Sequence, residues 1–261
     1  MKKNVVAIIQ ARVNSTRLPG KILKKINGIS FLELQLRRLK KCKKITRVVL
    51  AFPDNSSSNP LVNLAKKLGC TFFLGSEINL LSRYYNAAES VKADYIIRLT
   101  SDCPLLDFSL IDNMITLILR KKYDIVTNVL PPSWPDGLDV NIFTKGLLID
   151  AYNNANLLSD KEHVVPWMWK NSSLKNRKPY RGYNYKSANN YSNYRWTLDN
   201  HLDLNFFLKI SEKLSLKKLE EISTRELIDF LNKNKSLIKI NADNIRDSGY
   251  IKSLKKDNES K

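Results

Sequence analysis

The sequence predicts an α/β fold built on an open, mostly parallel, Rossmann-like sheet. Short apolar runs rich in β-branched residues recur along the chain, and the first of them is 5–9. Helical patterns lie between these runs, and the connections are short. Such alternation favours right-handed crossovers and a parallel sheet that is covered by helices on both faces.

Four strands and three helices are expected in the first hundred residues. The run 5–9 is continuously apolar, which is typical of a strand buried on both faces. A capping box at Ser30–Glu33 predicts the first helix, and Pro60 suits the first turn of the next one. The further strands are expected at 47–51, 71–74 and 95–99, and the helices at 31–44, 60–68 and 80–91.

The second half of the chain is less regular. Asp107 is expected to cap a helix at 108–121, and a fifth strand is expected at 123–128. Later elements are a short strand at 194–199 that leads into a helix, a helix at 224–234 and a strand at 237–240. We therefore expect one domain over residues 1–250, with an insertion at about 129–195 and a basic, disordered tail at 251–261.

Composition is that of a soluble globular protein, with 43% hydrophobic and 26% charged residues in a chain of 261. No apolar run is long enough to cross a bilayer and no signal-peptide core follows the N-terminus, so we expect no membrane insertion and a cytoplasmic location. Cys42, Cys70 and Cys103 lack metal-ligand spacing, which favours reduced structural thiols.

The formal net charge of +19 does not by itself indicate a nucleic-acid binder. The lysines occur as pairs on expected helix faces, for example Lys40–Lys41 and Lys217–Lys218, without the interleaved aromatic residues of known readers. We interpret the charge as a compositional bias that also attracts anionic substrates. No nucleic-acid partner is expected.

A loop with three cations follows the first expected strand. Arg12, Arg17 and Lys21 lie at the carboxyl end of that strand, where open α/β sheets bind ligands. The glycine patterns of dinucleotide-binding turns and P-loops are missing, so side chains would have to bind an anion such as phosphate. Pro19–Gly20 predicts a turn that directs Lys21 back to the strand end. The alternative is a surface loop that is basic only because the protein is basic.

The loop resembles the signature of one enzyme family. Residues 11–21, Ala-Arg-Val-Asn-Ser-Thr-Arg-Leu-Pro-Gly-Lys, resemble the loop of cytidylyltransferases that activate acidic sugars, the CMP-3-deoxy-manno-octulosonate and acylneuraminate synthetases. The resemblance is closest to the branch called spore coat polysaccharide biosynthesis protein F. In that family the loop wraps the triphosphate of CTP. The resemblance implies catalytic roles for Lys21, Arg12 and Arg17 and nucleotide binding by Gln10, Ala11, Arg12, Ser15, Lys21, Arg83 and Ser101.

Two aspartates at strand ends are candidate metal ligands. Asp102 leaves the strand at 95–99 and is followed by Pro104, which stops the strand ladder and favours a place in the ligand crevice. A carboxylate there can hold Mg²⁺ against triphosphate oxygens. The resemblance implies that Asp102 and Asp199 share one Mg²⁺. From the sequence alone, Asp199 could equally cap the next helix, and Asp203 could join the same rim or only favour the helix N-terminus.

Arg83 and two later segments complete the implied site. The guanidinium of Arg83 could bind the carbonyl and ring nitrogen of cytosine, although a surface arginine at a helix start is the alternative. The resemblance places Asp136 and Asp139 beside the acceptor sugar, whereas the sequence equally permits a turn into an antiparallel strand. His163, in a Glu-His-Val-x-Pro element, is either a substrate contact or a structural group.

The resemblance implies a nucleotide-diphospho-sugar transferase fold with a small antiparallel insertion for substrate or dimer contacts, and a homodimer. It also implies transfer of CMP from CTP to a sugar or sugar acid, with Mg²⁺ as cofactor and release of pyrophosphate, in surface polysaccharide or glycoconjugate biosynthesis. One alternative is a glycosyltransferase that uses a nucleotide sugar, which the loop argues against. Another is a non-catalytic basic module with salt-sensitive nucleic-acid affinity and no CTP binding.

Overall fold

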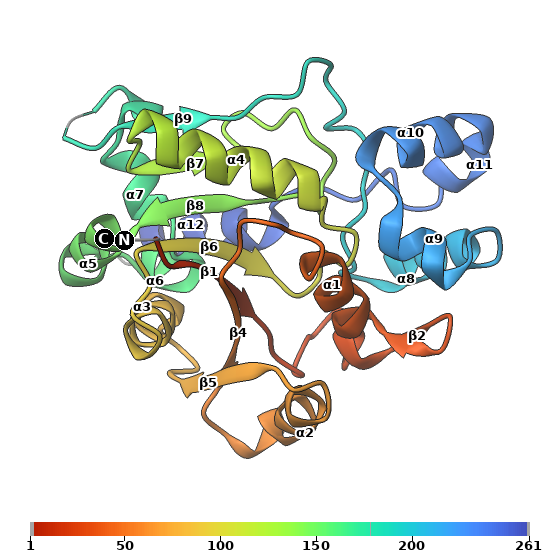
Figure 1. The fold of residues 1–261 in the computed structure, drawn as a ribbon, viewed down its shortest axis with the longest axis horizontal. Coiled ribbons are helices and arrows are strands. Elements are labelled where there is room, and N and C mark those ends of the chain that lie inside the picture. Colours follow the sequence, from red (N-terminus) through yellow and green to blue (C-terminus); the bar gives the residue numbers. More distant parts are fainter. Residues whose placement is uncertain (1–2, 178, 260–261) are drawn as a thin grey trace.

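A seven-stranded sheet forms the centre of the protein (Figure 1). The computed structural model describes residues 3–177 and 179–259. All neighbouring strands are parallel except β8, which runs antiparallel to both β6 and β7. The expected open, mostly parallel sheet is therefore confirmed. Across the sheet the strands are β5 (Thr71–Gly75), β4 (Arg47–Pro53), β1 (Val5–Gln10), β6 (Tyr95–Thr100), β8 (Asn141–Thr144), β7 (Ile125–Thr127) and β9 (Gly182–Asn184).

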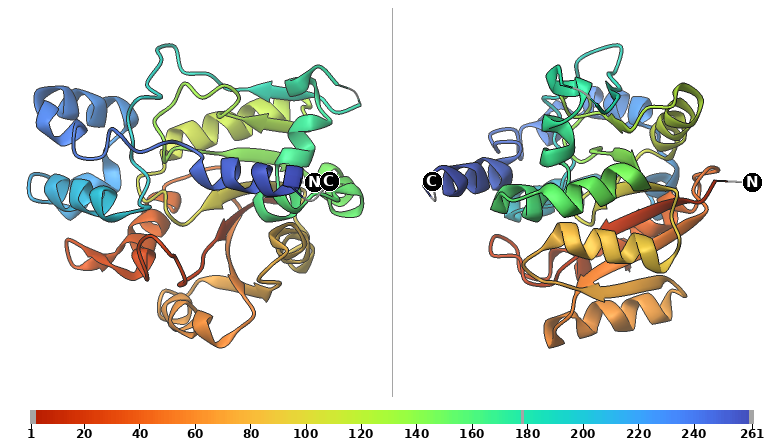
Figure 2. Two further views of the ribbon diagram at one scale, coloured as in Figure 1. Left: turned by 180° about the vertical axis from the view of Figure 1, so that it is seen from behind. Right: turned by 90° about the vertical axis from the view of Figure 1, so that its left-hand side faces the viewer.

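Helices cover both faces of the sheet, as the two further views show (Figure 2). β1 contributes Val5, Ala7 and Ile9 to one apolar core and Val6 and Ile8 to the other, because successive strand residues point to opposite faces. The first core is closed by α1 (Phe31–Leu39), α2 (Asn59–Lys67), α4 (Phe108–Lys121), α8 (His201–Ser211), α9 (Leu216–Glu221), α10 (Thr224–Lys233) and α11 (Lys235–Ile238). The second is closed by α3 (Leu80–Ser90), α5 (Lys145–Asn154) and α7 (Pro166–Lys170).

A small antiparallel sheet is present, formed by β2 (Lys25–Ile26) and β3 (Ile29–Ser30). It precedes the stretch 129–195, where an insertion is expected. That stretch contributes β8 and β9 to the main sheet and otherwise combines irregular segments with short helices, among them α6 (Leu158–His163) between α5 and α7. Whether it acts as an insertion for substrate or dimer contacts stays a prediction.

Three local expectations are wrong. Residues 194–199 form no strand and make only one isolated bridge, between Arg195 and Asp136, because their backbone bonds go to two different segments. Residues 237–240 belong in part to α11, where Leu237 packs into the core at helical rather than strand spacing. The tail up to residue 259 is helical: α12 (Ser248–Glu259) is held through buried polar side chains, which apolar patterns do not reveal. Residues 260–261 lie outside the described residues.

The helix cap expected at Asp107 is confirmed. Asp107 caps α4 by accepting hydrogen bonds from the backbone of Ser109 and Leu110. The three cysteines are free thiols. Within 3–177 and 179–259, no helix has the length and apolar character needed to cross a membrane.

Candidate functional site

A cavity of about 810 Å³ lies at the carboxyl ends of β1 and β6. The three-cation loop, the start of α3, the turn after β6, α6 and α12 all contribute to its walls. Eleven residues expected at the site from the sequence line this one cavity: Gln10, Ala11, Arg12, Ser15, Arg17, Lys21, Arg83, Ser101, Asp102, His163 and Asp199.

The loop after β1 turns back on itself at Gly20. This residue has a φ of 64°, in the left-handed region that glycine adopts without strain, and its amide donates to the carbonyl oxygen of Val13 at 3.1 Å. The Ser15 hydroxyl accepts from the amide of Leu18 at 3.4 Å. Lys21 follows at the start of a 3₁₀ turn, so its side chain returns to the strand end as expected.

Lys21 joins the two predicted metal-binding aspartates. Its Nζ donates to Asp102 Oδ2 at 2.9 Å and to Asp199 Oδ1 at 3.0 Å, and only 11% of its side chain is exposed. Burial alone would lower the pKa of Lys21, but the two carboxylates raise it above its ordinary value. Burial likewise opposes ionisation of Asp102, yet Lys21 outweighs it and lowers the pKa of that carboxyl to about 2. Lys21 and Asp102 are therefore both charged at neutral pH.

Backbone hydrogen bonds bring the two aspartates together. The amide of Leu198 donates to the carbonyl oxygen of Asp102 at 2.7 Å, and the hydroxyl of Thr197 donates to the same oxygen at 3.2 Å. On the other side, the amide of Ser101 donates to the carbonyl oxygen of Gln10 at 3.1 Å. Two segments almost a hundred residues apart thus end at one place, beside the end of β1.

Asp199 is not a helix cap. The cap of α8 is Asn200, which forms a reciprocal capping box with Asp203. Asp199 is instead bound by Lys21 and by Arg17, whose Nη2 lies 2.6 Å from its Oδ2. Asp203 is fully buried and so does not add a carboxylate to the cavity rim.

Arg195 holds the segment that carries Asp199. Its guanidinium binds Asp203 through two parallel bonds, Nε–Oδ1 at 2.8 Å and Nη2–Oδ2 at 2.9 Å, and its Nη1 donates to Asp136 Oδ2 at 2.7 Å. All of these groups are buried. The sequence alone assigns no role to Arg195, because its partners cannot be identified without the fold.

Asp136 and Asp139 do not line the cavity. Asp136 is paired with Arg195, and Asp139 accepts from Arg246, which also donates to the carbonyl oxygen of Trp134. Burial raises the pKa of Asp139 to about 7 and also raises that of Asp136. Their expected contact with an acceptor has no support from the cavity and stays a prediction.

Arg83 is a buried cation directed at the cavity. Its side chain lies on α3 with 5% of the residue exposed, and its Nε and Nη1 have no hydrogen-bond partner in the part of the chain that the structure describes. Burial lowers its pKa to about 10, so it remains charged at neutral pH. Buried donors without partners are costly, and a ligand with acceptor groups in the cavity would satisfy them.

His163 lines the cavity and also contacts the C-terminal helix. Its Nε2 lies 2.9 Å from the hydroxyl of Ser253, and its ring packs edge-on against Tyr250. Burial, assisted by Arg98, lowers its pKa to about 4, so the imidazole is neutral at pH 7. The position is compatible with both roles expected for it.

The residues at the cavity fit a divalent cation that arrives with substrate. Asp102 and Asp199 already share one cation, the Lys21 ammonium, so both carboxylates face one position. Carboxylate oxygens suit Mg²⁺, which proteins commonly bind through one or two carboxylates together with substrate phosphates. No group of three or more acidic, His or Cys side chains suited to a metal occurs among the described residues. The site therefore fits a metal ion that is bound jointly by the two carboxylates and by substrate phosphates, rather than one bound by protein ligands alone.

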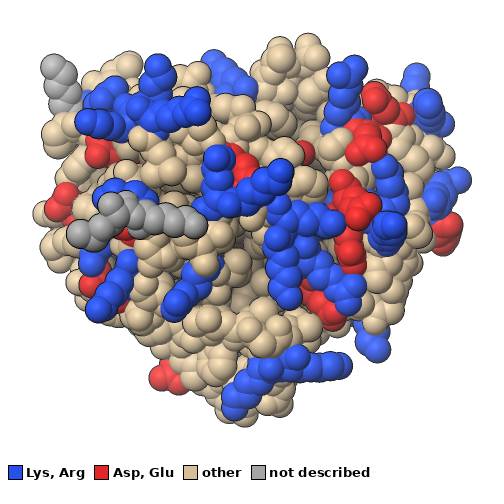
Figure 3. Space-filling model, viewed as in Figure 1, with Lys and Arg blue, Asp and Glu red and all other residues tan. Residues whose placement is uncertain are grey.

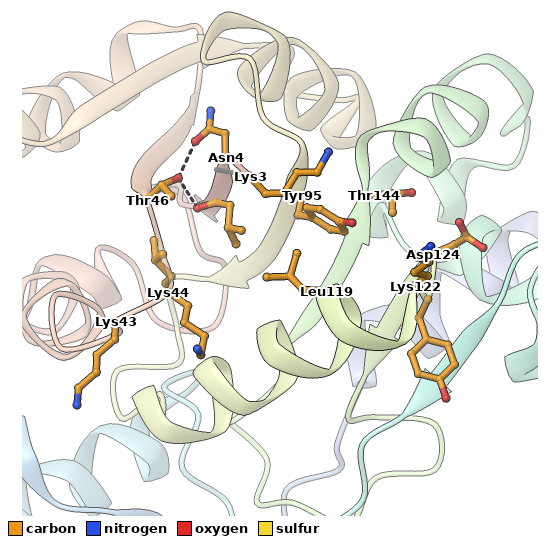
Figure 4. Close-up of a pocket in the computed structure, with 13 residues that line it drawn as sticks. Lys3, Asn4, Lys43, Lys44, Thr46, Tyr95, Leu119, Lys122, Asp124 and Thr144 are labelled. Atoms are coloured by element: carbon orange, nitrogen blue, oxygen red, sulfur yellow. Dashed lines mark hydrogen bonds between the residues drawn. The ribbon is translucent and has the colours of Figure 1, made fainter. Parts of the chain in front are cut away.

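A second cavity of about 1150 Å³ lies at the amino-terminal ends of the parallel strands, opposite the first cavity. Figure 4 shows Lys44, Tyr95 and Leu119 beside the ends of several elements, and Thr46 hydrogen-bonded to Asn4 at 2.6 Å. None of the residues expected at the site lies there. Lysines and arginines are spread over many elements on the face seen in Figure 3. That no nucleic acid is bound stays a prediction.

Known proteins resemble this chain over most of its length. A family profile described as Cytidylyltransferase matches residues 6–240. The spore coat polysaccharide biosynthesis protein SpsF of Bacillus subtilis is 30% identical over 239 residues, which cover 88% of this chain and 95% of SpsF. A cytidylyltransferase from Leptospira borgpetersenii has a TM-score of 0.83 at 33% identity, with 93% of this chain and 98% of that chain covered. A CMP:2-keto-3-deoxy-manno-octonic acid synthetase complexed with CTP shares the fold, with a TM-score of 0.61 at 13% identity and 81% and 100% covered.

Proposed function

Because the chain belongs to the cytidylyltransferase family and is a CTP-dependent nucleotidyltransferase, we propose that it transfers CMP from CTP to a sugar or sugar acid. Pyrophosphate is the other product. The similarity to SpsF, a protein named for spore coat polysaccharide biosynthesis, supports a place in surface polysaccharide synthesis.

The observation that carries the proposal is the convergence of Lys21, Asp102 and Asp199 in one cavity. They come from three separate parts of the chain, yet a single ammonium joins both carboxylates. A site that binds a triphosphate with a divalent ion needs cations for the phosphates and carboxylates for the ion. The same cavity holds Arg12 and Arg17 for the first purpose.

In the proposed mechanism, Arg83 binds the cytosine. Arg83 lines the cavity, and a planar guanidinium can present two parallel N–H donors to the acceptor edge formed by the cytosine carbonyl and ring nitrogen. Arg12, Arg17 and Lys21 bind the phosphates and stabilise the negative charge that grows on them as an acceptor oxygen attacks the α-phosphorus in line. The bond to pyrophosphate breaks as the bond to the acceptor forms.

Asp102 and Asp199 would hold Mg²⁺, which would neutralise phosphate charge when bound. For Lys21 this requires an exchange of partners. Its ammonium leaves the two carboxylates and turns to phosphate oxygens, which a flexible side chain with a point charge can do. Lys21 then contributes to catalysis from its new position against the phosphate oxygens.

The acceptor side of the proposal rests on His163. Of the three residues expected to contact the acceptor, Asp136, Asp139 and His163, only His163 lines the cavity. As a neutral imidazole it can donate or accept a hydrogen bond. A homodimer remains part of the proposal by analogy with the family.

The test has two stages. First, thermal shifts of the purified protein are measured with each of the four nucleoside triphosphates and Mg²⁺; stabilisation by CTP above the other three is expected. Second, pyrophosphate release is followed over a panel of sugar acids. Asp102→Asn should reduce turnover of an active acceptor on the order of 100-fold or more. Full pyrophosphate release by this variant would contradict the assignment.

A further inference from the structure

The C-terminal helix α12 forms one side of the nucleotide cavity. Ser253 and Lys256 of α12 line the cavity together with Lys161 and His163 of α6, the helix beside which α12 packs. Figure 2 shows α12, the dark blue helix, lying across the molecule near the C-terminus. The family match ends at residue 240, so family membership gives α12 no role.

Polar side chains dock α12 onto α6. The Ser253 hydroxyl lies 2.9 Å from His163 Nε2 and donates to Glu162 Oε2 at 2.7 Å. One turn later, Asp257 Oδ1 accepts from the amide of Ser159 at 3.2 Å. Both Ser253 and Asp257 are only 6% exposed. The orientation of α12 about its axis is therefore fixed by specific bonds.

The fixed orientation determines where Lys256 lies. Residues three apart on a helix share a side, and Ser253 is held at the cavity wall. Lys256 is on that same side and lines the cavity, whereas its neighbour Lys255 does not. Two lysines of equal chemistry on one helix thus differ in whether they face the cavity.

The start of α12 contacts the predicted phosphate-binding loop. Arg17 Nη1 donates to the hydroxyl of Ser248 at 2.8 Å, while its Nη2 is paired with Asp199. One arginine therefore connects α12, the loop and a carboxylate of the candidate metal site. The helix is attached to the site at its first residue and again at Ser253.

We propose that α12 is a wall of the nucleotide site and that Lys256 contacts the phosphates of bound CTP. The inference rests on the proposed function. Within CTP, the base and ribose are neutral and the phosphates carry the charge, so phosphate oxygens are the partners for an ammonium in this cavity. Lys256 adds a cation to the cavity from a segment other than the loop that carries Arg12 and Lys21.

The test compares Lys256→Ala with Lys255→Ala in the full chain. Both changes remove one positive charge from α12. Binding of CTP and of cytidine is measured by titration calorimetry. We expect Lys256→Ala to weaken CTP binding about tenfold, or 1.4 kcal/mol, with cytidine binding unchanged, and Lys255→Ala to behave like the wild type. Equal CTP affinities in the two variants would overturn the inference. A wild-type protein that fails to bind CTP would instead refute the proposed function.

Hydrogen exchange provides a measurement that needs no variant. CTP should slow exchange of the α12 amides in the wild-type protein, because bound phosphates would hold Lys256 and with it the helix. The amides of α2, which lines no part of this cavity, serve as the internal control. If CTP protects the loop 12–21 but leaves α12 unchanged, the inference is wrong even though the nucleotide binds.

Discussion

Replacing Lys21 with methionine tests the arrangement at the centre of the site. Lys21→Met keeps a flexible side chain of similar length but removes the ammonium that Asp102 and Asp199 share. Arg17 can still neutralise Asp199. Asp102 is then left without the cation that keeps it ionised.

The expected loss of stability at pH 7 is about 2 kcal/mol. Burial alone would raise the pKa of Asp102, but Lys21 outweighs burial and lowers this pKa from 3.8 to about 2. At about 1.36 kcal/mol per pKa unit, this shift corresponds to roughly 2.4 kcal/mol. The side chain of Asp102 is 29% exposed, so solvent screening reduces the figure somewhat.

The sign of the pH dependence follows from the direction of the shift. A depressed carboxyl pKa stabilises the folded protein above pH 3.8, and this contribution is lost as the pH falls through 3.8 towards 2. In Lys21→Met, burial should raise the pKa of Asp102 instead, so protonation of Asp102 at low pH removes an unpaired charge that destabilises the folded variant. The stability difference between wild type and variant should therefore be largest near pH 7 and shrink below about pH 4.

Urea unfolding at pH 7 and at pH 3.5, followed by circular dichroism, measures this difference. Lys25→Met is the matched control, because Lys25 is exposed on β2 and loses the same charge. The reasoning would be refuted if Lys21→Met were as stable as Lys25→Met at pH 7, or if its deficit were the same at both pH values.

Four further outcomes are expected. Without nucleotide, Lys21→Met should bind Mn²⁺ more tightly than wild type in a metal titration, because the competing ammonium is gone; equal affinities would speak against a shared cation site. Arg83→Lys keeps the charge but loses the planar fork, so calorimetry should show CTP binding weakened about tenfold, with cytidine affected as strongly. Between pH 7 and pH 5, the free energy of unfolding of the wild type should fall by about 2 kcal/mol relative to that of His163→Gln, because the pKa of His163 is lowered from 6.5 to about 4 and only the unfolded chain takes up the proton; urea unfolding of both proteins checks this difference, from which groups common to both, such as Asp139, cancel. Gly137→Ala should cost more than about 2 kcal/mol, because φ is 101° and a Cβ would lie 2.5 Å from the Trp196 carbonyl carbon; Gly146→Ala, with open space around it, should not.

Much of the sheet could be predicted because its central strands are buried on both faces. The expected strands at 5–9, 47–51, 71–74 and 95–99 are all present, each within one or two residues of its expected ends. The outer strands gave weaker signals. β9 has no apolar pattern in Gly182–Asn184, and the 194–199 segment has strand-like composition but bonds to two different carbonyl groups. Local composition cannot distinguish an extended segment from a paired strand.

The candidate site, like the sheet, could be predicted only in part. The cations of the loop and Asp102 come directly after expected strands, so the order of elements along the chain is enough to place them at the ligand-binding ends of the strands. The pairs that support them do not follow from local patterns: Arg195 and Asp136 are 59 residues apart, and Arg246 and Asp139 are 107 apart. α12 was missed for a related reason. Its buried face carries Ser253 and Asp257, whose partners exist only in the folded chain.

The position of Lys21 explains how the protein keeps two carboxylates together in a cavity that is mainly cationic. Asp102 and Asp199 would repel one another if they shared only solvent, and Lys21 removes that cost within the protein itself. Because Lys21 is bonded to both carboxylates, substrate can bind only if Lys21 exchanges the carboxylates for phosphate oxygens and the carboxylates exchange Lys21 for a divalent ion. Phosphate alone would draw Lys21 away and leave Asp102 without its cation, while a divalent ion alone would displace Lys21 without giving it a new partner. The two together satisfy all three groups, so the geometry favours their joint binding over either one separately.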